Sequence, residues 1–259
     1  MNLQINNPVK ADLLTAIFQN MKSFSNSINL MVEEDRIFVQ AIDAGHVAIV
    51  ELTIPAEWFD KATLTSTVIG INSTILYKIL STRDKCQSIE FELQDDGMGI
   101  KFTSDNKAIF DKTFRMPLID IDVEQMEIPE IDYQAEFSLP SATFANLINQ
   151  LKLFGDAMDI ECSEDKITLV SNSLECGTMS ANINIDDLTA FAIEENETVK
   201  MSFSLAHLHS IGQFSKLAKE VEIKLKRNYP VQIVYSLDDV IPATVRFYLA
   251  PKIGDDDNE

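Results

Sequence analysis

The sequence predicts an α+β protein built from two similar halves, and three observations lead to this fold class. First, residues 11–41 resemble residues 141–171 at a constant offset of 130 positions, without a gap. Second, short runs in both halves alternate apolar and polar side chains, which is typical of half-buried strands. Third, each half contains apolar residues at helical spacing. Strands joined by tight turns imply antiparallel sheets, so we expect each half to combine such sheets with two amphipathic helices.

The internal repeat extends through most of the chain. Leu14 aligns with Phe144 at the offset of 130, and residues 89–93 align with residues 221–225 at an offset of 132. Few of the aligned residues are identical, but the positions expected to be buried recur. A repeat of this length indicates two structurally similar domains rather than one continuous fold.

Four helices are expected from the spacing of apolar residues. The first covers about residues 9–22, with Pro8 near its start, where proline is tolerated. Its counterpart follows Pro140, and Ser141 is the expected N-cap. Two shorter helices fit about residues 73–81 and 205–214.

Strands are predicted where apolar residues alternate with polar ones. These apolar positions are Ile28/Leu30/Val32, Ile37/Val39/Ala41, Val47/Ile49, Ile89/Phe91/Leu93, Ile100/Phe102, Val221/Ile223/Leu225 and Val231/Ile233/Tyr235. The tripeptide Asp95-Asp96-Gly97 separates two of these runs and predicts a hairpin turn.

Charge is distributed unevenly along a chain whose net charge is −20. Residues 1–116 carry 11 basic and 15 acidic side chains, whereas residues 136–259 carry 10 basic and 20 acidic ones. Between them, residues 117–135 carry six acids and no base, as expected of a solvated connector. We therefore predict an N-terminal domain at 1–117, a connecting segment at 118–135 and a C-terminal domain at 136–259.

Sequence motifs give no support for an enzyme. Neither a GxxxxGK[ST] phosphate loop nor a GxGxxG motif is present. His207 and His209 are two positions apart, so on a helix they point in different directions, which does not suit a shared metal ion. The three cysteines are widely spaced and are read as free thiols. We expect no catalytic residue, metal or cofactor, although a site assembled in space from distant residues stays open.

The predicted helices differ in charge from the rest of the chain. Residues 10–22, 72–85, 141–154 and 205–219 together carry a net charge of +6, so the remainder carries −26. One interpretation is that these are ordinary solvated helix faces. The other is a basic surface on an acidic body, which would contact a polyanion and repel it elsewhere.

Several segments spread over the whole chain resemble the eukaryotic-type proliferating cell nuclear antigen family. These segments are the loop Asp43–Val47, the connecting loop Asp120–Glu130, the start of the second domain at Ser138–Phe144, the C-terminal run Phe247–Ile253 and the acidic tail Asp255–Glu259. The resemblance implies a DNA-clamp fold, with six similar domains from three copies of the chain forming a pseudo-six-fold ring. It implies a sliding clamp for DNA replication and repair, with helices lining the hole and without enzymatic activity.

The resemblance also implies which residues contact DNA and partners. Carried over by position, the residues that would face DNA phosphates are Lys10, Lys22, Lys78, Arg83, Lys152, Lys216 and Lys219. The positions that would bind a short partner peptide are Ile42, His46, Ile49, Met126, Ile128, Pro129, Pro230, Tyr248, Leu249 and Ala250. The expected partners are double-stranded DNA, a DNA polymerase, a clamp loader and other replication and repair proteins.

Subunit contacts would join one edge strand from each domain. The expected edges are about Ala108–Met116 and Leu174–Ile183. The residues assigned to them are Ala108, Phe110, Thr113, Phe114, Cys176, Thr178, Ser180 and Ile183. Pairing of this kind adds main-chain hydrogen bonds between chains.

Some features depart from the family pattern, and other readings stay open. Glu164 occupies the position of the family lysine that receives ubiquitin, which puts that form of regulation in doubt. A nuclear location, or a viral replication compartment, follows from family analogy alone. The main alternative is a subunit of a heterotrimeric, checkpoint-type clamp; an acidic interaction module that never meets DNA is another.

Overall fold

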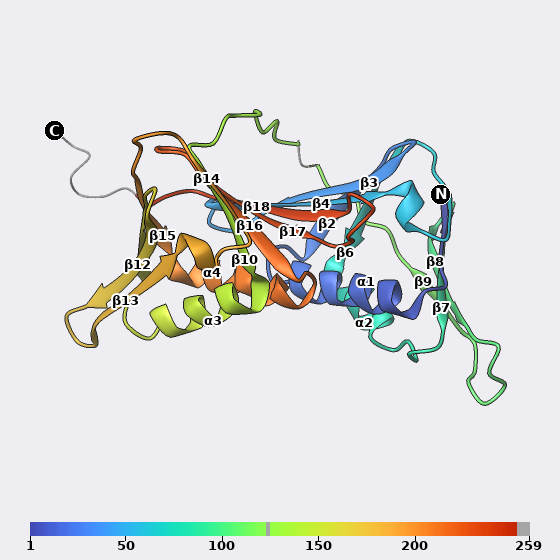
Figure 1. Ribbon diagram of the computed structural model, residues 1–259. Coiled ribbons are helices and arrows are strands. Elements are labelled where there is room, and N and C mark those ends of the chain that lie inside the picture. The colour runs from blue at the N-terminus through green and yellow to red at the C-terminus, as the bar shows by residue number, and fades with distance from the viewer. Residues whose placement is uncertain (123–124, 253–259) are drawn as a thin grey trace. The chain divides into compact units, whose positions relative to one another are not determined.

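The computed structural model describes residues 1–122 and 125–252 (Figure 1). It therefore leaves three parts of the predicted features outside the described residues, namely Val123 and Glu124 of the connecting segment, Ile253 of the C-terminal run and the acidic tail Asp255–Glu259. Within the described part, no helix is long and apolar enough to cross a membrane.

The chain divides into two compact units. The first holds Met1–Ala44, Val50–Met126 and Leu237–Val245, and the second holds Gly45–Ile49, Glu127–Ser236 and Arg246–Glu259.

The first repeat contains nine strands, two α-helices and one 3-10 helix among the described residues. In chain order they are β1 (Asn2–Ile5), α1 (Pro8–Met21), β2 (Ser27–Val32), β3 (Arg36–Ile42), β4 (Ala48–Pro55), η1 (Ala56–Trp58), β5 (Lys61–Thr63), β6 (Thr67–Asn72), α2 (Ser73–Leu80), β7 (Ser88–Gln94), β8 (Gly97–Thr103) and β9 (Lys112–Met116).

The second repeat follows the same order and adds one 3-10 helix after its last α-helix. Its elements are β10 (Ala135–Pro140), α3 (Ser141–Leu151), β11 (Ala157–Cys162), β12 (Lys166–Ser173), β13 (Gly177–Asn184), η2 (Ile185–Asp187), β14 (Ala190–Ile193), β15 (Val199–Ser204), α4 (Leu205–Gly212), η3 (Gln213–Lys216), β16 (Glu220–Leu225), β17 (Val231–Ser236) and β18 (Thr244–Leu249).

Strand order confirms that the two halves share one topology. The first repeat has the orders β5-β1-β7-β8-β9 and β4-β3-β2-β6. The second has β14-β10-β16-β17-β18 and β13-β12-β11-β15, in which every strand occupies the place of its counterpart. In both repeats the counterpart pairings β1–β7 and β10–β16, and β2–β6 and β11–β15, are antiparallel, as in the register Ile28 with Ile71 in β2–β6. The α+β fold of two similar halves, predicted from the repeat and the periodicity, is therefore confirmed.

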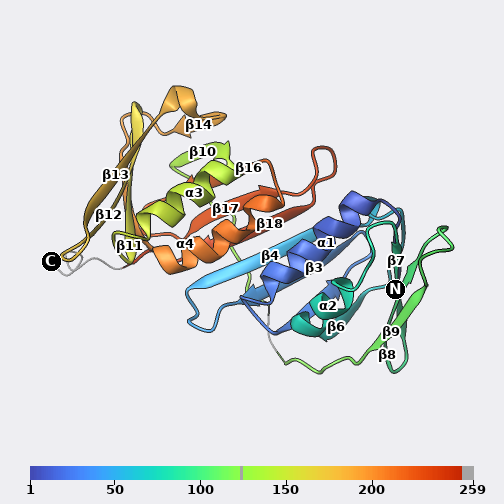
Figure 2. The same cartoon turned by 90° about the horizontal axis from the view of Figure 1, so that it is seen from below.

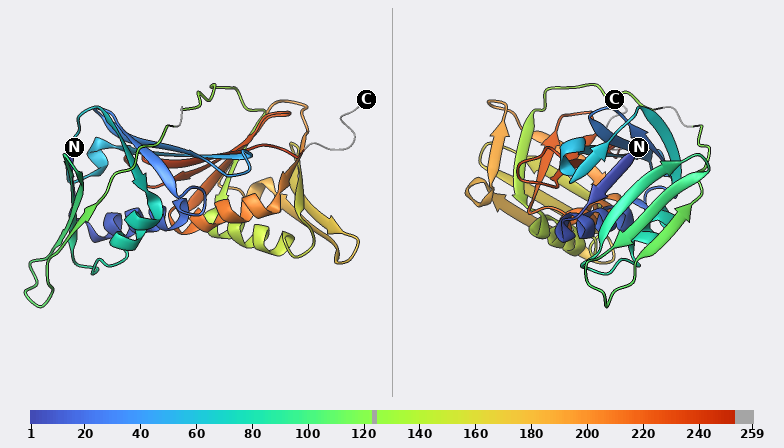
Figure 3. Two further views of the ribbon diagram at one scale, coloured as in Figure 1. Left: turned by 180° about the vertical axis from the view of Figure 1, so that it is seen from behind. Right: turned by 90° about the vertical axis from the view of Figure 1, so that its right-hand side faces the viewer.

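In each repeat the two helices pack against one another and cover a sheet. Figure 2 shows α1 beside α2 and α3 beside α4, and both pairs are in contact. The left view of Figure 3 shows the sheet strands of each repeat above its helices. The helix residues that face inward, such as Leu14 and Phe18 in α1, are buried, which explains their helical spacing in the sequence.

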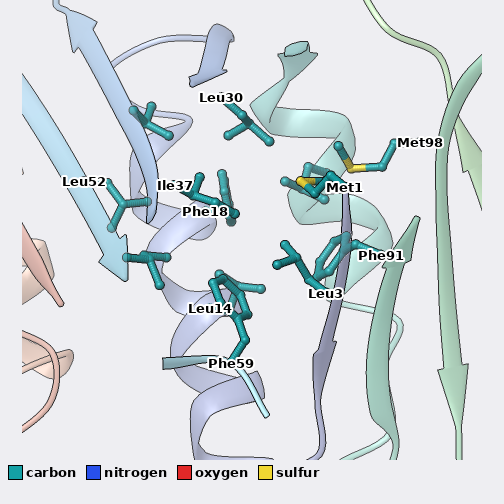
Figure 4. A pocket seen from close by; sticks show the side chains of 13 residues that line it. Met1, Leu3, Leu14, Phe18, Leu30, Ile37, Leu52, Phe59, Phe91 and Met98 are labelled. Carbon is teal, nitrogen blue, oxygen red and sulfur yellow. The ribbon is translucent and has the colours of Figure 1, made fainter. Parts of the chain in front are cut away.

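The core of the first unit surrounds a small cavity lined only by apolar side chains (Figure 4). Side chains from α1, α2 and the strands point into it, among them Leu14, Leu30 and Phe91. The second unit has a matching apolar cavity lined by Phe144, Ile160 and other core residues. Because both cavities lie inside the cores, they mark loose packing between helices and sheets rather than binding sites.

Helix starts agree with the predictions in one half and differ in the other. Asn7 caps α1 by accepting hydrogen bonds from the amides of Val9 and Lys10 at 2.9 and 3.4 Å. The prediction that Ser141 caps α3 is wrong, because Ser141 is the first helical residue and Pro140 precedes it as the cap. The Ser141 hydroxyl instead donates to the Ser215 carbonyl at 2.8 Å, and also to that of Ala218, so it fixes the start of α3 to the segment after α4.

The hairpin predicted at Asp95-Asp96-Gly97 is confirmed, since Gln94 of β7 pairs with Gly97 of β8.

The alternation predicted at Val47 and Ile49 is shifted by one residue from the pattern of burial in β4. The buried residues of β4 are Ala48, Val50, Leu52 and Ile54, so Ile49 lies on the other face and is half-buried.

Candidate nucleic-acid and partner-binding surfaces

The four α-helices carry only one carboxylate among their described residues, although the chain has 41 acidic side chains. That carboxylate is Asp12 of α1, and it forms an ion pair with Arg83. α3 and α4 contain no Asp, Glu, Lys or Arg, so their faces are neutral except for histidine. Acidic groups are thus concentrated on strands and loops, which makes the helix faces the least repulsive surfaces toward a polyanion.

The lysines predicted to face DNA fall into two groups. Lys78, Lys152, Lys216 and Lys219 are exposed at or near helix ends. Lys10 is engaged with its own unit: its Nζ donates to the Trp58 carbonyl at 2.7 Å and lies 5.2 Å from the centre of the Trp58 ring.

Lys22 and Arg83 also contact protein groups. The Lys22 Nζ lies 4.2 Å from the centre of the Tyr77 ring, so a cation–π contact joins the end of α1 to α2. The Arg83 side chain is only 2% exposed. It donates to the carbonyls of Asp84, Lys85 and Gln87 at 3.1, 3.1 and 2.9 Å, in addition to its ion pair. A buried guanidinium with four acceptors serves the structure, and it neutralises Asp12.

The histidines of α4 form polar contacts within the second unit. His207 Nδ1 lies 2.9 Å from Ser204 Oγ, and His209 Nδ1 lies 2.7 Å from Asn149 Oδ1 on α3. No group of three or more His, Cys, Asp or Glu side chains suited to a metal ion occurs among residues 1–122 and 125–252.

The predicted partner-binding positions of the first unit are Ile42 and Met126. Ile42 is half-buried, and Met126 is 48% exposed in an otherwise acidic segment. Both main-chain groups of Met126 are bonded to the Gln40 side chain, with its N–H donating to Oε1 at 2.8 Å and its carbonyl accepting from Nε2 at 2.9 Å.

The remaining predicted partner-binding positions belong to the second unit. His46 is exposed and has φ +55°, a left-handed conformation that is uncommon outside glycine and is often found at functional sites. The amide of Ala250 donates to the Val47 carbonyl at 2.9 Å, which fixes the C-terminal run beside the loop of His46. Ile128 is half-buried, and Pro129 and Pro230 are exposed.

Tyr248 and Leu249 have different surroundings. The half-buried Tyr248 accepts a hydrogen bond from Gln232 Nε2 at 3.0 Å through its hydroxyl. Leu249 is 0% exposed, so its side chain belongs to the core and would not contact a partner in this conformation.

Sequence reasoning missed Tyr133, whose pKa is raised to about 12 by burial, with smaller contributions from Tyr248 and Glu136. Its place beside Tyr248 depends on the folded sheet, so no local pattern could have revealed it.

The two predicted subunit edges correspond to terminal strands. β9 ends the order β5-β1-β7-β8-β9, and β13 ends the order β13-β12-β11-β15. Thr113, Thr178 and Ser180 are exposed on these strands, while Phe114 and Ile183 are half-buried.

Both edge strands are shorter at their N-terminal ends than expected. Ala108 and Phe110 precede β9 in a turn, in which the side chain of Asn106 accepts from the Ala108 amide at 3.0 Å. Cys176 lies before β13, where its amide donates to Ser173 Oγ at 3.0 Å. Phe110 and Leu174 are 84% and 107% exposed, so a large apolar side chain lies near the start of each edge.

The chain contains two tandem copies of one topology, each with a helix pair on a sheet. Comparison with known families agrees: residues 6–125 match the N-terminal domain of proliferating cell nuclear antigen, and residues 127–252 match its C-terminal domain. The chain therefore belongs to the proliferating cell nuclear antigen family. It is a sliding clamp, a class of non-enzymatic processivity factors in DNA replication, with DNA and replication proteins as partners in general.

Proposed function

We propose that three copies of this chain form a closed ring around duplex DNA and hold a polymerase and other replication and repair proteins on it. The near absence of acidic groups from the helices carries this proposal. In a chain of net charge −20, a surface with one carboxylate, itself paired with Arg83, is suited to lie next to phosphates. The ring would work where DNA is copied, in a nucleus or a viral replication compartment.

Contact with DNA would be weak and independent of sequence. Exposed lysines such as Lys78, Lys152 and Lys216 offer charge to phosphates, and phosphate contacts carry no direct sequence information. The neutral faces of α3 and α4 provide few points of attachment. A clamp held by its topology benefits from this, because few contacts at any instant allow it to slide.

Ring assembly would use β9 of one subunit and β13 of the next. These are two different surfaces of the same chain, so their pairing is heterologous and closes only if the rotation between subunits permits it. Strand addition would satisfy main-chain groups at both edges. Burial of Phe110 and Leu174 would add apolar area at the start of each edge.

Partner proteins would dock through a short peptide that has a glutamine, an aliphatic residue and two aromatic residues. Met126 and Ile128 are apolar side chains in an acidic segment, and His46 and Pro230 are exposed residues at the predicted positions. Burying aromatic side chains stabilises such a complex, but ordering the peptide offsets most of the gain, so micromolar affinity is expected.

Charge reversal on the helices tests the DNA contact. The variant Lys78→Glu/Lys152→Glu/Lys216→Glu should reduce the processivity of a clamp-dependent polymerase at least roughly threefold at low salt, and its difference from wild type should narrow as salt increases, because fewer phosphate contacts remain for salt to weaken. Its matched control reverses three exposed lysines on strands β5, β8 and β12, namely Lys61, Lys101 and Lys166.

Both variants change the net charge by the same amount, so a general charge effect would affect them equally. The proposal requires that only the helix variant lose processivity while both keep the wild-type mass in solution. Equal processivity of the two variants would show that these helix lysines do not face DNA.

A further inference from the structure

The connecting segment is attached to the first unit at three points on one row of the sheet. The Ile119 amide donates to the Gly70 carbonyl of β6 at 2.9 Å. Asn29 Nδ2 of β2 donates to the Ile121 carbonyl at 3.2 Å, and Gln40 of β3 bonds both main-chain groups of Met126. Figure 2 shows the segment after β9 passing β6.

The three anchors come from neighbouring strands in matched register. Asn29 lies opposite Gly70 in the β2–β6 pairing. In the β2–β3 pairing Leu30 lies opposite Val39, so the next step of the same register brings Asn29 opposite Gln40. Gly70, Asn29 and Gln40 therefore form one row across β6, β2 and β3, and this row holds Ile119, Ile121 and Met126 of the connecting segment.

Gly70 and Gln40 show how closely the segment is held. A Cβ atom on Gly70 would lie 2.0 Å from the Ile119 carbonyl oxygen, so only glycine lets the segment approach β6 here. Gln40 is itself oriented by Glu51 of β4, whose Oε1 accepts from Gln40 Nε2 at 3.0 Å. The Gln40 carboxamide thus supplies Met126 with the donor and acceptor that a paired strand would supply.

We propose that Gln40 is a positioning residue for partner binding: by holding the main chain of Met126, it keeps the connecting segment in the conformation that partner peptides bind. This inference rests on the proposed peptide recruitment. Because the Met126 N–H and carbonyl are already bonded, a peptide that adds alongside the segment would use the main chain of other residues. The aliphatic side chain of Met126, 48% exposed, stays available to it.

The test uses the full chain as wild type, Gln40→Leu and Gln94→Ala. Leucine fills a similar space without the two hydrogen bonds. Gln94 is the matched control, because it is a glutamine of the first unit that bonds the side chain of Glu92 on its own strand. Amide hydrogen exchange of residues 125–128 is measured first, and binding of a synthetic peptide with one glutamine, one aliphatic and two aromatic residues is measured second.

In Gln40→Leu we expect exchange at 125–128 to accelerate roughly tenfold and the peptide Kd to rise roughly three- to tenfold, since the competent conformation becomes less populated. Gln94→Ala should match wild type in both. Unchanged exchange in Gln40→Leu would overturn the anchoring, and faster exchange with unchanged Kd would overturn the positioning role. Failure of the wild type to bind the peptide would instead reject recruitment, and the positioning role with it, whatever the exchange result.

Discussion

The buried Arg83 side chain both stabilises the first unit and neutralises Asp12 on α1. Arg83→Ala should therefore destabilise the first unit. The side chain is 2% exposed and donates to three carbonyls as well as to Asp12. After its removal, water can reach the carbonyls of Asp84 and Lys85, which lie at the surface. It can also reach Asp12, which is 56% exposed. Only the partly buried Gln87 carbonyl is left without easy solvation.

The expected loss is therefore roughly that of one buried acceptor and the packing of the arginine stem, about 2–3 kcal/mol in the free energy of unfolding. Trp58 provides the measurement, because it is the only tryptophan of the chain and is fully buried in the first unit. Its fluorescence in a urea titration reports on that unit. With a slope of about 1–3 kcal/mol per M, the midpoint should fall by about 0.7–3 M.

The control is Lys85→Ala, an exposed neighbour whose removal should change stability by less than about 0.5 kcal/mol. A midpoint for Arg83→Ala equal to that of wild type would refute the structural role. The double variant Asp12→Asn/Arg83→Ala should stay destabilised, because the carbonyl contacts are still lost. The single variant Arg83→Ala leaves the Asp12 carboxylate unpaired on the helix face, which should lower clamp activity. The double variant removes this negative charge, so it should regain that activity although it stays destabilised.

Three further predictions concern the partner surface, the thiols and alkaline pH. Ile128→Ala should weaken binding of the synthetic peptide by roughly 1–2 kcal/mol in calorimetry, and an unchanged Kd would exclude Ile128 from the docking surface. A thiol reagent at pH 8 should modify the exposed Cys86 within minutes but Cys162 only after unfolding, since burial raises the pKa of Cys162 to about 11; rapid modification of Cys162 in the folded protein would contradict this. The pKa of Tyr133 is about 12 when folded and 10 when exposed, so its contribution to stability is complete below pH 10 and is lost as pH rises toward 12; Tyr133→Phe should flatten that decline in alkaline unfolding, and an identical pH profile would contradict it.

The fold was predictable because buried residues recur at a regular spacing. This spacing is kept in both halves of the chain, although few aligned residues are identical. The spacing of Leu14 and Phe18 gave α1, and the same spacing gave α3 in the second half. It is harder to predict which face of a short strand is buried. In β4 both faces carry apolar residues, so Ile49 could not be separated from the buried Ala48 and Val50 by alternation alone.

The candidate sites were only partly predictable, because contacts across the sheet leave no local signal. A basic residue near a helix end looks the same in sequence whether it is exposed, as Lys78 is, or buried against carbonyls, as Arg83 is. Gln40 gave no signal either, since its role depends on the register of β2, β3 and β6 and on the path of a distant segment. The boundaries of the two domains and the roles of the lysines stay predictions.

The mass of the purified chain in solution tests the central claim most directly. Light scattering should give three times the 29.1 kDa of one chain, about 87 kDa, over a wide range of concentration. That result would show that copies of this chain assemble with one another into a trimer. A mass of 29.1 kDa at all concentrations would contradict the homotrimer and favour a chain whose edges prefer different partners, as in a heterotrimeric clamp.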